Sequence, residues 1–479
     1  MNRRPQSFAD MWTGLSTRFL PFADAATEKL PLSRLLRLSL FQVSCGMALV
    51  LLTGTINRVM IVELSVPAWI VSVMIGLPLV FAPLRALIGH KSDTHKSVLG
   101  WRRGPYIFFG SMIQFGGLAI MPFALLILSG NNQVPAPEWL GQASAALAFL
   151  LVGAGLHTTQ TAGLALATDL ATEESRPRVV ALLYTMLLVG MGLSAIVFGW
   201  LLRDFSHLRL VQVIQGAAAA TMVLNVIALW KQEVRDPSKT ALNRKTVSFS
   251  EAWSSLITQP GAIRLLVAVG LGTAAFSMQD ALLEPYGGEV LGMSVSETTL
   301  LTALFAAGSL VGFAWCARRL SRGGEPHRLA GFGAVAGVAA FAAVLFAGTI
   351  NSTTLFCVGA TLIGFGGGLY AVGTLTAAMR IAAHCDSGIA LGAWGAVQAT
   401  AAGLAIAVGG AIRDLAVGLQ STEIFGAAMQ SPAAAYGVVY HIEIALLFAA
   451  ILAIGPLARH AVIPPMQAQE RFGLAAHPG

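Results

Sequence analysis

The chain has 479 residues, of which 56% are hydrophobic and only 11% carry a charge. Soluble domains carry roughly 25% charged residues, so this composition excludes an ordinary soluble domain and favours lipid as the solvent. The net charge of +7 does not indicate a nucleic-acid partner, because the basic residues lie in short connections between apolar blocks. These blocks of about twenty residues can each cross the bilayer, and they must be helical because lipid cannot hydrogen-bond the backbone.

The apolar pattern predicts an all-α membrane protein with twelve transmembrane helices. Their expected ranges are 38–60, 67–88, 105–129, 143–168, 179–202, 210–230, 264–285, 298–317, 328–348, 353–378, 388–411 and 437–458. We expect the chain to divide into a cytoplasmic or membrane-surface segment (1–37), an N-terminal six-helix half (38–230), a cytoplasmic linker (231–263), a C-terminal six-helix half (264–458) and a cytoplasmic tail (459–479).

The basic residues predict the orientation of this bundle. If both termini lie on one side, that side holds 26 of the 30 Lys and Arg residues. The other side keeps only Arg58, Arg203, Arg209 and Arg413. Because cytoplasmic connections are rich in Lys and Arg, both termini are expected in the cytoplasm.

The two halves repeat each other weakly. Residues 153–169 in the fourth expected helix and 364–380 in the tenth both begin Gly-x-Gly and end in a charge, Asp169 in one and Arg380 in the other. Six plus six helices with weak repetition are typical of the major facilitator superfamily, whose halves pack around a cavity at the membrane midplane. Glycine-rich stretches such as Gly364-x-x-x-Gly368 predict close helix packing.

The connection after the second helix contains Gly89 and, four residues later, Asp93, followed by Gly100, Arg102 and Arg103. This arrangement resembles the loop motif of the major facilitator superfamily with an insertion. Two interpretations are open. The connection forms part of a gate, or its basic residues only fix the topology.

His157 lies well inside the fourth expected helix, and Gln160 follows one turn later. A neutral imidazole is a metal ligand, and by extension it can bind the central magnesium of a chlorin. The alternative is a histidine that is hydrogen-bonded between helices by neighbouring hydroxyl groups. No Cys or His spacing indicates a free metal site.

Asp280 and Glu284 lie four residues apart near the end of the seventh expected helix, and we expect them to share one face. Pro285 and the following glycine pair are predicted to break this helix. Carboxylates inside a membrane are costly, so the pair needs an explanation. The two acids relay protons, bind a metal or a polar headgroup, or pair with a basic residue such as Arg58.

From their sequence context alone, we ascribe the other polar residues in the spans to helix packing, among them Gln398, His441 and Glu443. The sequence contains no phosphate loop, no His-Glu-x-x-His motif and no nucleophile elbow. We therefore expect no nucleotide cofactor and no enzymatic activity, which disfavours an ATP-driven pump or a hydrolase.

Several long stretches together resemble the PucC/LhaA family of purple phototrophic bacteria, also called the bacteriochlorophyll delivery family. The resemblance covers most of the chain, and the stretches that carry it are 38–44, 57–64, 85–93, 156–170, 279–288 and 390–400. The family looks like the major facilitator superfamily, which agrees with the expected architecture. The run from Arg18 to Asp24 resembles the members that serve the core antenna around the reaction centre.

The resemblance implies an assembly factor in the inner, intracytoplasmic photosynthetic membrane, which binds bacteriochlorophyll and delivers it to antenna polypeptides. The implied partners are antenna polypeptides, reaction centre–antenna complexes, pigment-synthesis enzymes and the lipid bilayer. Under this interpretation His157 is the candidate magnesium ligand. The candidate pigment-binding residues are His157, Gln160, Gln279, Asp280, Glu284 and Gln398.

Two other functions remain open from the sequence. A proton-coupled transporter of a small solute would explain the carboxylates at 280 and 284. A chaperone that binds antenna helices without pigment would explain the membrane location alone. Helix rise puts Glu284 and His157 at depths that differ by roughly 15–20 Å, so they are not expected to bind the same atom.

Overall fold

The structure is a computed structural model that describes residues 31–80, 88, 92, 103–129, 137–171, 176–233, 254, 256–382, 387–420 and 431–460. These residues form helices and turns and contain no strand. Eleven helices are long and apolar enough to cross a membrane, and a twelfth, Ala68–Leu79, is apolar but shorter. The prediction of an all-helical, multi-pass membrane protein is confirmed.

The N-terminal half contains the first six spans. The first span is one nearly continuous rod made of α2 (Leu32–Leu38), α3 (Leu40–Leu49), η2 (Val50–Thr55), α4 (Ile56–Arg58) and η3 (Val59–Glu63). The other five spans are α5 (Ala68–Val80), α7 (Gly104–Leu128), α8 (Glu138–Leu170), α9 (Arg176–Leu201) and α10 (His207–Leu229). The first span begins before residue 38, where the apolar pattern placed its start, and the end of the second span lies outside the described residues.

The C-terminal half contains the remaining spans. The seventh consists of α12 (Ala262–Ser277), η5 (Met278–Ala281) and α13 (Leu283–Glu289). The others are α14 (Val295–Ser321), α15 (Pro326–Thr349), α16 (Thr353–Ala382), α17 (Ser387–Gln420) and α18 (Pro432–His460). Most of the proposed linker at 231–263 lies outside the described residues, so its structure stays a prediction.

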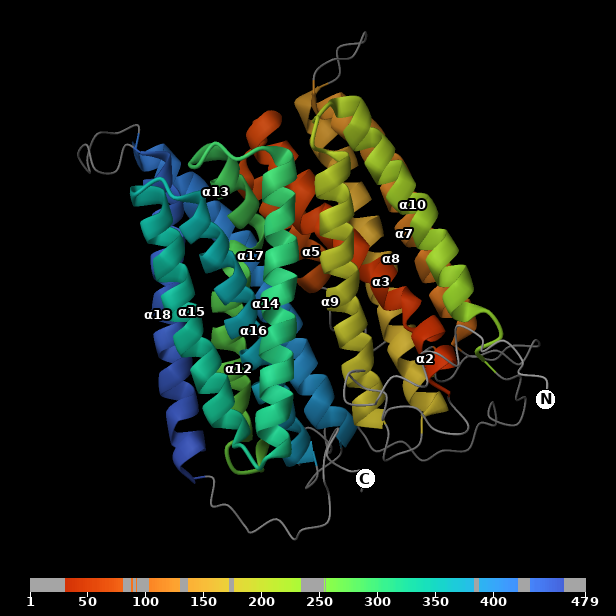
Figure 1. Cartoon of the computed structure of the whole chain (residues 1–479), viewed down its shortest axis with the longest axis vertical. Helices are drawn as coiled ribbons and strands as arrows, with labels where there is room; N and C mark the ends of the chain where they lie inside the picture. Colours follow the sequence, from red (N-terminus) through yellow and green to blue (C-terminus); the bar gives the residue numbers. More distant parts are fainter. Residues whose placement is uncertain are drawn as a thin grey trace, which may run out of the picture.

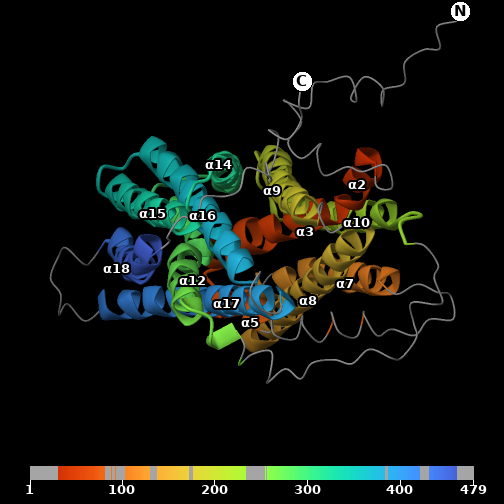
Figure 2. The same cartoon turned by 90° about the horizontal axis from the view of Figure 1, so that it is seen from below.

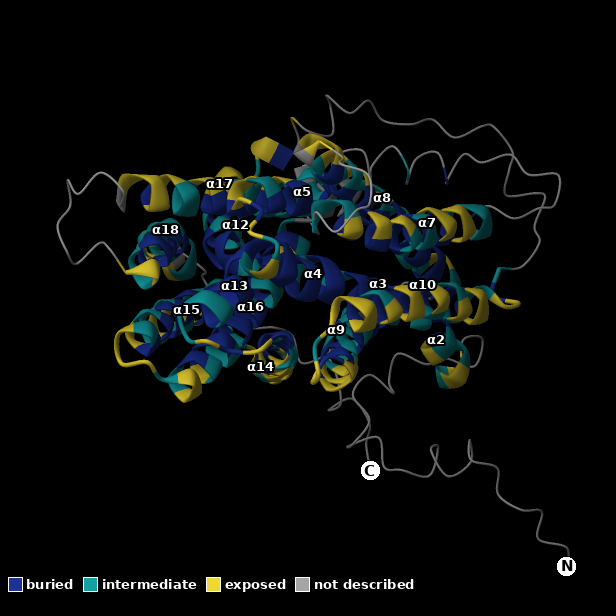
Figure 3. Cartoon of the chain, turned by 90° about the horizontal axis from the view of Figure 1, so that it is seen from above, coloured by how far each residue is buried: buried dark blue, intermediate teal, exposed yellow. Residues whose placement is uncertain are grey.

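The helices gather into two groups, α2–α10 and α12–α18, which lie side by side (Figures 1 and 2). Figure 3 shows buried residues concentrated where the helices face one another and exposed residues on the outward faces. Many exposed side chains are large and apolar, for example Phe109 at 64% and Leu452 at 75%. Such an apolar exterior is what a bilayer solvates, since lipid tails take the place of water.

Glycine allows the helix backbones to approach closely, as the sequence predicted. A Cβ on Gly364 of α16 would lie 2.8 Å from the backbone carbonyl carbon of Phe305 on α14. A Cβ on Gly366 would lie 2.7 Å from the backbone oxygen of Gly333 on α15. Gly364 therefore allows α16 to pack closely against α14, and Gly366 allows it to pack closely against α15. A larger side chain at either position would keep the helix backbones apart.

The two halves contact each other at the ends of helices that the charge pattern places on the outer side. Here α5 packs against α17 and α9 packs against α14. The Ser296 hydroxyl donates to the carbonyl of Gly199 at 2.5 Å, and the Trp69 backbone N–H donates to the Asp414 carboxylate at 2.8 Å. These non-covalent contacts hold the two halves together at this end.

At the opposite end, Arg103 ties together the ends of several N-terminal helices. Its Nε lies 3.1 Å from the Asp169 carboxylate at the end of α8, and its guanidinium donates to the Ser92 hydroxyl at 2.5 Å. The Glu233 carboxylate accepts the backbone N–H groups of Arg103 and Gly104 at 2.9 Å and 2.6 Å. This part of the loop motif stabilises helix ends within one half. Gly89, Asp93, Gly100 and Arg102 lie outside the described residues.

The start of α15 carries a charged cap, Glu325, which precedes the candidate membrane span Pro326–Thr349. The Glu325 carboxylate accepts the backbone N–H of Arg328 at 2.7 Å and lies 2.6 Å from Nδ1 of His327. Partial burial disfavours the carboxylate, but these hydrogen bonds outweigh it and hold the pKa of Glu325 below its ordinary value.

We expect Glu325→Ala to lower the free energy of unfolding by about 0.5–2 kcal/mol at neutral pH. Because the folded-state pKa is depressed, the cap stabilises the protein above the unfolded-state value of 4.5 and loses its effect as the pH falls through the lower folded value. Thermal unfolding of both proteins in mild detergent over a pH series measures this. A difference in Tm that stayed constant into strong acid would contradict the assignment.

Candidate functional site

The first span changes from α-helix to π-helix next to the boundary between the halves. Two stretches of π-helix, η2 and η3, flank the short α4. π-Helical turns are rare and occur frequently at functional sites. Within η2, Gly54 lies against the Glu284 side chain of the other half, since a Cβ there would lie 3.0 Å from its carboxyl carbon. The absence of a side chain at 54 therefore makes room for the acid.

The seventh span is interrupted near its middle, at a place the sequence did not predict. The prediction that Pro285 and the glycine pair break this helix is wrong, because α13 runs from Leu283 through both glycines to Glu289. The interruption is the 3₁₀ segment η5, which contains Asp280. Pro285 is compatible with helix because it lies in the first turn of α13, where a missing N–H costs little.

This interruption places Asp280 and Glu284 on one cavity although they lie on different helical segments. The cavity has a volume of about 170 Å³ and lies between the halves. It is lined by residues of the first, fifth, seventh and eighth spans: Leu49, Thr53, Met191, Gln279, Asp280, Leu283, Glu284, Thr302 and Phe305. Three predicted site residues are thus brought together.

Hydrogen bonds hold these polar groups in place. Glu284 accepts from the Thr302 hydroxyl at 2.7 Å, and the Gln279 amide donates to Asp280 at 2.7 Å. Asn57 of the first span donates to the backbone carbonyl of Ala281 at 2.9 Å, which fixes the interrupted segment across the boundary. One carboxylate oxygen of Glu284 and the amide oxygen of Gln279 are buried without a hydrogen-bond partner.

Arg58 is not the partner of Glu284. Its guanidinium pairs with Glu63 and donates to the backbone carbonyl of Met293 at 3.1 Å. Arg58 therefore joins the C-terminal end of the first span to the loop after α13. Of the three interpretations of the acids, the structural ion pair with Arg58 is the one the geometry disfavours.

His157 and Gln160 form a separate polar group on α8. His157 is 9% exposed, and the Gln160 amide donates to the Gln42 side chain of α3 at 3.3 Å. By helical spacing His157 lies between the face of Gly153, which packs on Pro78 of α5, and the face of Gln160. His157 thus belongs to the side of α8 that faces the first two spans.

The two groups lie at different levels of the first span. Leu156 lies beside Cys45, whose Sγ is 3.9 Å from its carbonyl oxygen, whereas Glu284 lies beside Gly54. Nine residues separate Cys45 from Gly54, which corresponds to roughly 13 Å along a helix. This spacing supports the expectation that His157 and Glu284 do not bind the same atom.

Gln398 is not brought into either group. It is half-buried on α17 and does not line the cavity between the halves. One turn earlier, the Trp394 indole donates to the Thr374 hydroxyl of α16 at 3.3 Å, so this part of α17 serves helix packing.

Glu443 is a residue that reasoning from sequence left outside the site. It is fully buried on α18. It lies within electrostatic reach of Asp280 and beside the backbone of Gln279. A carboxylate in the last apolar span was the available signal, but only the fold shows that it lies near the interruption in the seventh span.

The sequence matches the family described as PUCC protein over residues 55–462. It is 56% identical over 468 residues to the "uncharacterized protein in puhA-bchM intergenic region" of Rhodobacter capsulatus, covering 97% of this chain and 98% of that one. It is 60% identical over 418 residues to "Protein PucC" of Rhodovulum sulfidophilum, covering 86% and 92%. A third relative, the "bacteriochlorophyll synthase 44.5 kDa chain" of Rhodobacter capsulatus, is 29% identical over 91% of this chain and 99% of its own.

Two solved structures with a similar architecture are homologues of transporters. A bacterial homologue of the human lysosomal transporter Spinster, in an inward-facing state, has a TM-score of 0.65 at 15% identity and covers 88% of this chain and 95% of its own. A bacterial homologue of the iron transporter ferroportin, also inward-facing, has a TM-score of 0.65 at 14% identity, with 89% and 99% covered. These likenesses establish a fold of the major facilitator type and nothing about the molecule that is bound.

Proposed function

This chain belongs to the PUCC protein family, and on that premise we propose that it is a membrane assembly factor that binds bacteriochlorophyll and delivers it to antenna polypeptides, the core antenna in particular. The proposal includes no chemical reaction. Its structural support is the buried His157–Gln160 group in a membrane helix, which offers an imidazole nitrogen and an amide where lipid offers neither. The third relative is named a bacteriochlorophyll synthase chain, and this name supports bacteriochlorophyll as the pigment.

The donor chemistry of this group fits a chlorin. His157 would supply a neutral nitrogen to the central magnesium, and the Gln160 amide would orient a peripheral carbonyl group or the histidine side chain. When bound, the pigment supplies the light-absorbing ring that the antenna requires. The residues of α8 only hold it and keep water away from it.

The Gln279, Asp280 and Glu284 group has a different role in this proposal. Because it lies at another level of the first span, we assign it to a second polar contact, with the pigment periphery or with a partner helix. Gln398, the last of the candidate pigment-binding residues, is assigned to helix packing on α17 in this proposal. Partners in this scheme are antenna polypeptides, reaction centre–antenna complexes and pigment-synthesis enzymes, in the photosynthetic inner membrane with both termini in the cytoplasm.

We expect His157→Ala to lose most of the bacteriochlorophyll that the wild-type protein retains on purification from its native membrane in mild detergent. The reason is that the substitution removes the magnesium ligand while leaving the helix intact. An absorption spectrum normalised to protein, read in the near-infrared, measures the pigment, and a gel of the same sample shows co-purified antenna polypeptides.

His441→Ala is the matched control, because His441 also lies in a membrane helix but is exposed and has its Nδ1 2.6 Å from the Gly437 carbonyl of its own helix. It should retain pigment like the wild type. Equal pigment in the His157 variant and the wild type would remove His157 from the set of ligands. Antenna polypeptides co-purifying with a pigment-free wild-type protein would support a chaperone that binds helices alone.

A proton-coupled transporter of a small solute is the second candidate, and the cavity lined by Asp280 and Glu284 favours it. Alternating access places a substrate site between the two halves of such folds. Uptake into vesicles that requires a proton gradient and fails in Asp280→Asn would establish this function. Co-purified pigment without uptake of any solute tested would support the assembly factor instead.

A further inference from the structure

The cavity between the halves combines polar groups with apolar walls. Its volume is about 170 Å³, and four of its nine lining side chains, Leu49, Met191, Leu283 and Phe305, are apolar. A dry protein cavity of about 150 Å³ holds a benzene molecule, so this cavity has room for a ligand of about five or six heavy atoms. The walls suit the hydrocarbon part of such a ligand, and the polar groups decide what its other end must be.

The polar side chains that line the cavity have already used their hydrogen-bond donors. The Thr302 hydroxyl donates to Glu284, and the Thr53 hydroxyl donates to a backbone carbonyl of its own helix at 2.9 Å. The Gln279 amide donates to a backbone carbonyl of α12 at 3.2 Å and to Asp280. One oxygen of Glu284 and one of Gln279 keep no partner, although these residues are only 4% and 1% exposed. A ligand that satisfies both oxygens must bring hydrogen-bond donors.

The charge around the cavity is negative. Asp280 and Glu284 line it, and Glu443 lies within electrostatic reach of Asp280. Arg58 acts on Glu284 from a distance, but its guanidinium is paired with Glu63, so the two together add no net positive charge. The C-terminal end of α12, directly before η5, adds the partial negative charge of a helix dipole. These groups together favour a ligand that carries a positive charge.

The lining fits an organic cation better than a metal ion. Among the residues that the structure describes, no group of three or more His, Cys, Asp or Glu is placed to hold a metal ion. The apolar walls supply no oxygen ligand to a hard cation, whereas they can cover a short alkyl chain. An alkylammonium ion has N–H donors and a positive charge at one end and hydrocarbon at the other, which matches both parts of the cavity.

We propose that the cavity between the halves binds a small primary alkylammonium ion. The ammonium group donates to the unpartnered oxygens of Glu284 and Gln279 and lies beside the Asp280 carboxylate. The alkyl chain lies against the apolar walls, which Met191 and Phe305 supply from the two halves. This inference does not rest on pigment binding at His157, so the two proposals can fail independently.

The test is thermal unfolding of the full-length protein in mild detergent, with n-butylammonium chloride as the probe. n-Butanol is the neutral compound of the same length, tetrabutylammonium is a cation too large for the cavity, and sodium chloride represents a metal ion at equal ionic strength. n-Butylammonium at millimolar concentrations should raise the Tm of the wild type in a saturable manner, because a ligand that binds only the folded state stabilises it. The other three compounds should leave Tm unchanged.

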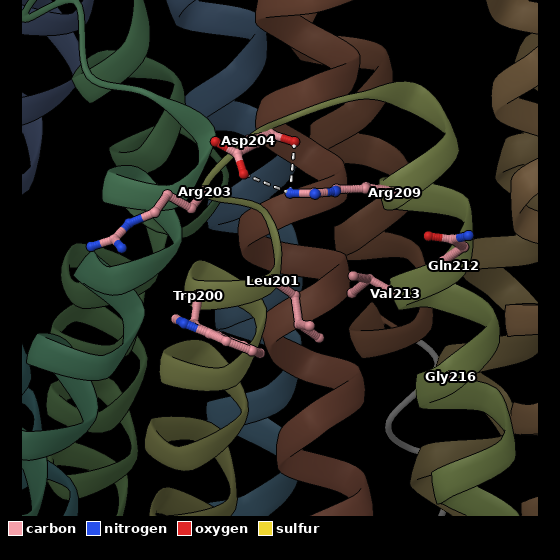
Figure 4. A pocket seen from close by; sticks show the side chains of 8 residues that line it. All are labelled: Trp200, Leu201, Arg203, Asp204, Arg209, Gln212, Val213 and Gly216. Atoms are coloured by element: carbon pink, nitrogen blue, oxygen red, sulfur yellow. Dashed lines mark hydrogen bonds and ion pairs between the residues drawn. The ribbon is translucent and has the colours of Figure 1, made fainter.

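Two variants test the carboxylates directly. Glu284→Gln and Asp280→Asn keep the shape of each side chain and remove its charge, so both should lose most of the Tm increase caused by n-butylammonium. Asp204→Asn is the matched control, because Asp204 is an exposed carboxylate in the turn between α9 and α10, pairs with Arg209 at 3.0 Å and does not line this cavity (Figure 4). It should respond to n-butylammonium as the wild type does.

Two results would overturn the proposal. The first is an equal rise in Tm of the wild type with n-butanol, tetrabutylammonium or sodium chloride, which would show a solvent, surface or metal-ion effect. The second is an undiminished response to n-butylammonium in both Glu284→Gln and Asp280→Asn. The comparison of the four compounds on the wild type decides the outcome even where a variant does not fold.

Discussion

Replacing Gly364 with leucine should abolish accumulation of folded protein in the membrane. A Cβ at this position would lie 2.8 Å from the carbonyl carbon and 3.1 Å from the Cα of Phe305, so the obstacle is backbone that cannot rotate away. The α14–α16 contact must open to admit any side chain, and alanine should already cost more than the roughly 1–3 kcal/mol typical of overpacking. Membrane accumulation of a tagged protein and its thermal unfolding in mild detergent measure the effect.

The control is the same pair of substitutions at Gly331 on the neighbouring α15, where a Cβ meets nothing within 4 Å. Glycine to alanine in a helix is otherwise neutral or stabilising by about 1 kcal/mol, so Gly331→Ala should not lower Tm. If Gly364→Ala and Gly331→Ala unfolded at the same temperature, close α14–α16 packing would not be the reason for glycine at 364.

Much of this architecture is predictable from sequence because membrane helices obey a strong local rule. Every apolar block must satisfy its own backbone hydrogen bonds, so the spans follow from block length alone. The interruption of the seventh span could not be predicted in the same way. Pro285 and the glycines were the visible helix breakers, yet η5 forms at Met278–Ala281, where Asn57 of the other half binds the Ala281 carbonyl. The interruption thus coincides with a contact from distant sequence, which a single sequence does not reveal.

The candidate site was predictable only where its residues are close in sequence. Gln279, Asp280 and Glu284 share one stretch, and the structure places all three on one cavity. Gln398 was a candidate only because of the resemblance to a family, and it does not line this cavity. Glu443 lies near Asp280 in the fold, although more than 160 residues separate them in the sequence. A single sequence carries no information on which faces of the seventh and twelfth spans meet, so this neighbour could not be named in advance.

Removing the ring of Tyr286, the one aromatic residue of the Gln279–Gly288 stretch, should be costly for stability. Its ring is 1% exposed and lies 5.3 Å from the rings of Phe356 and Tyr436 and 5.6 Å from that of Tyr440. Tyr286→Ala leaves a cavity among three rings, which typically costs about 3–5 kcal/mol. Because lipid also solvates apolar groups, the loss of stability comes from lost contacts between the rings and not from exposing apolar surface.

Tyr286→Phe separates the ring from its hydroxyl group. The hydroxyl donates to the Val344 carbonyl at 3.3 Å, a long hydrogen bond whose loss should cost no more than about 1 kcal/mol. Phe346→Ala on α15 is the control for aromatic truncation, because that ring is 63% exposed and should be nearly neutral. Thermal unfolding should therefore rank Tyr286→Ala far below both other variants, and equal losses in Tyr286→Ala and Phe346→Ala would contradict the packing role.

The same series separates structure from chemistry in a stretch that marks the family. If Tyr286 acts only through packing, Tyr286→Phe should retain pigment and support antenna assembly as the wild type does, while Tyr286→Ala should lose both in proportion to its lost stability. A folded Tyr286→Phe variant without pigment would instead place the hydroxyl group among the pigment contacts. That outcome would move the functional centre from α8 toward the interrupted seventh span, where Asp280 and Glu284 already line the cavity between the halves.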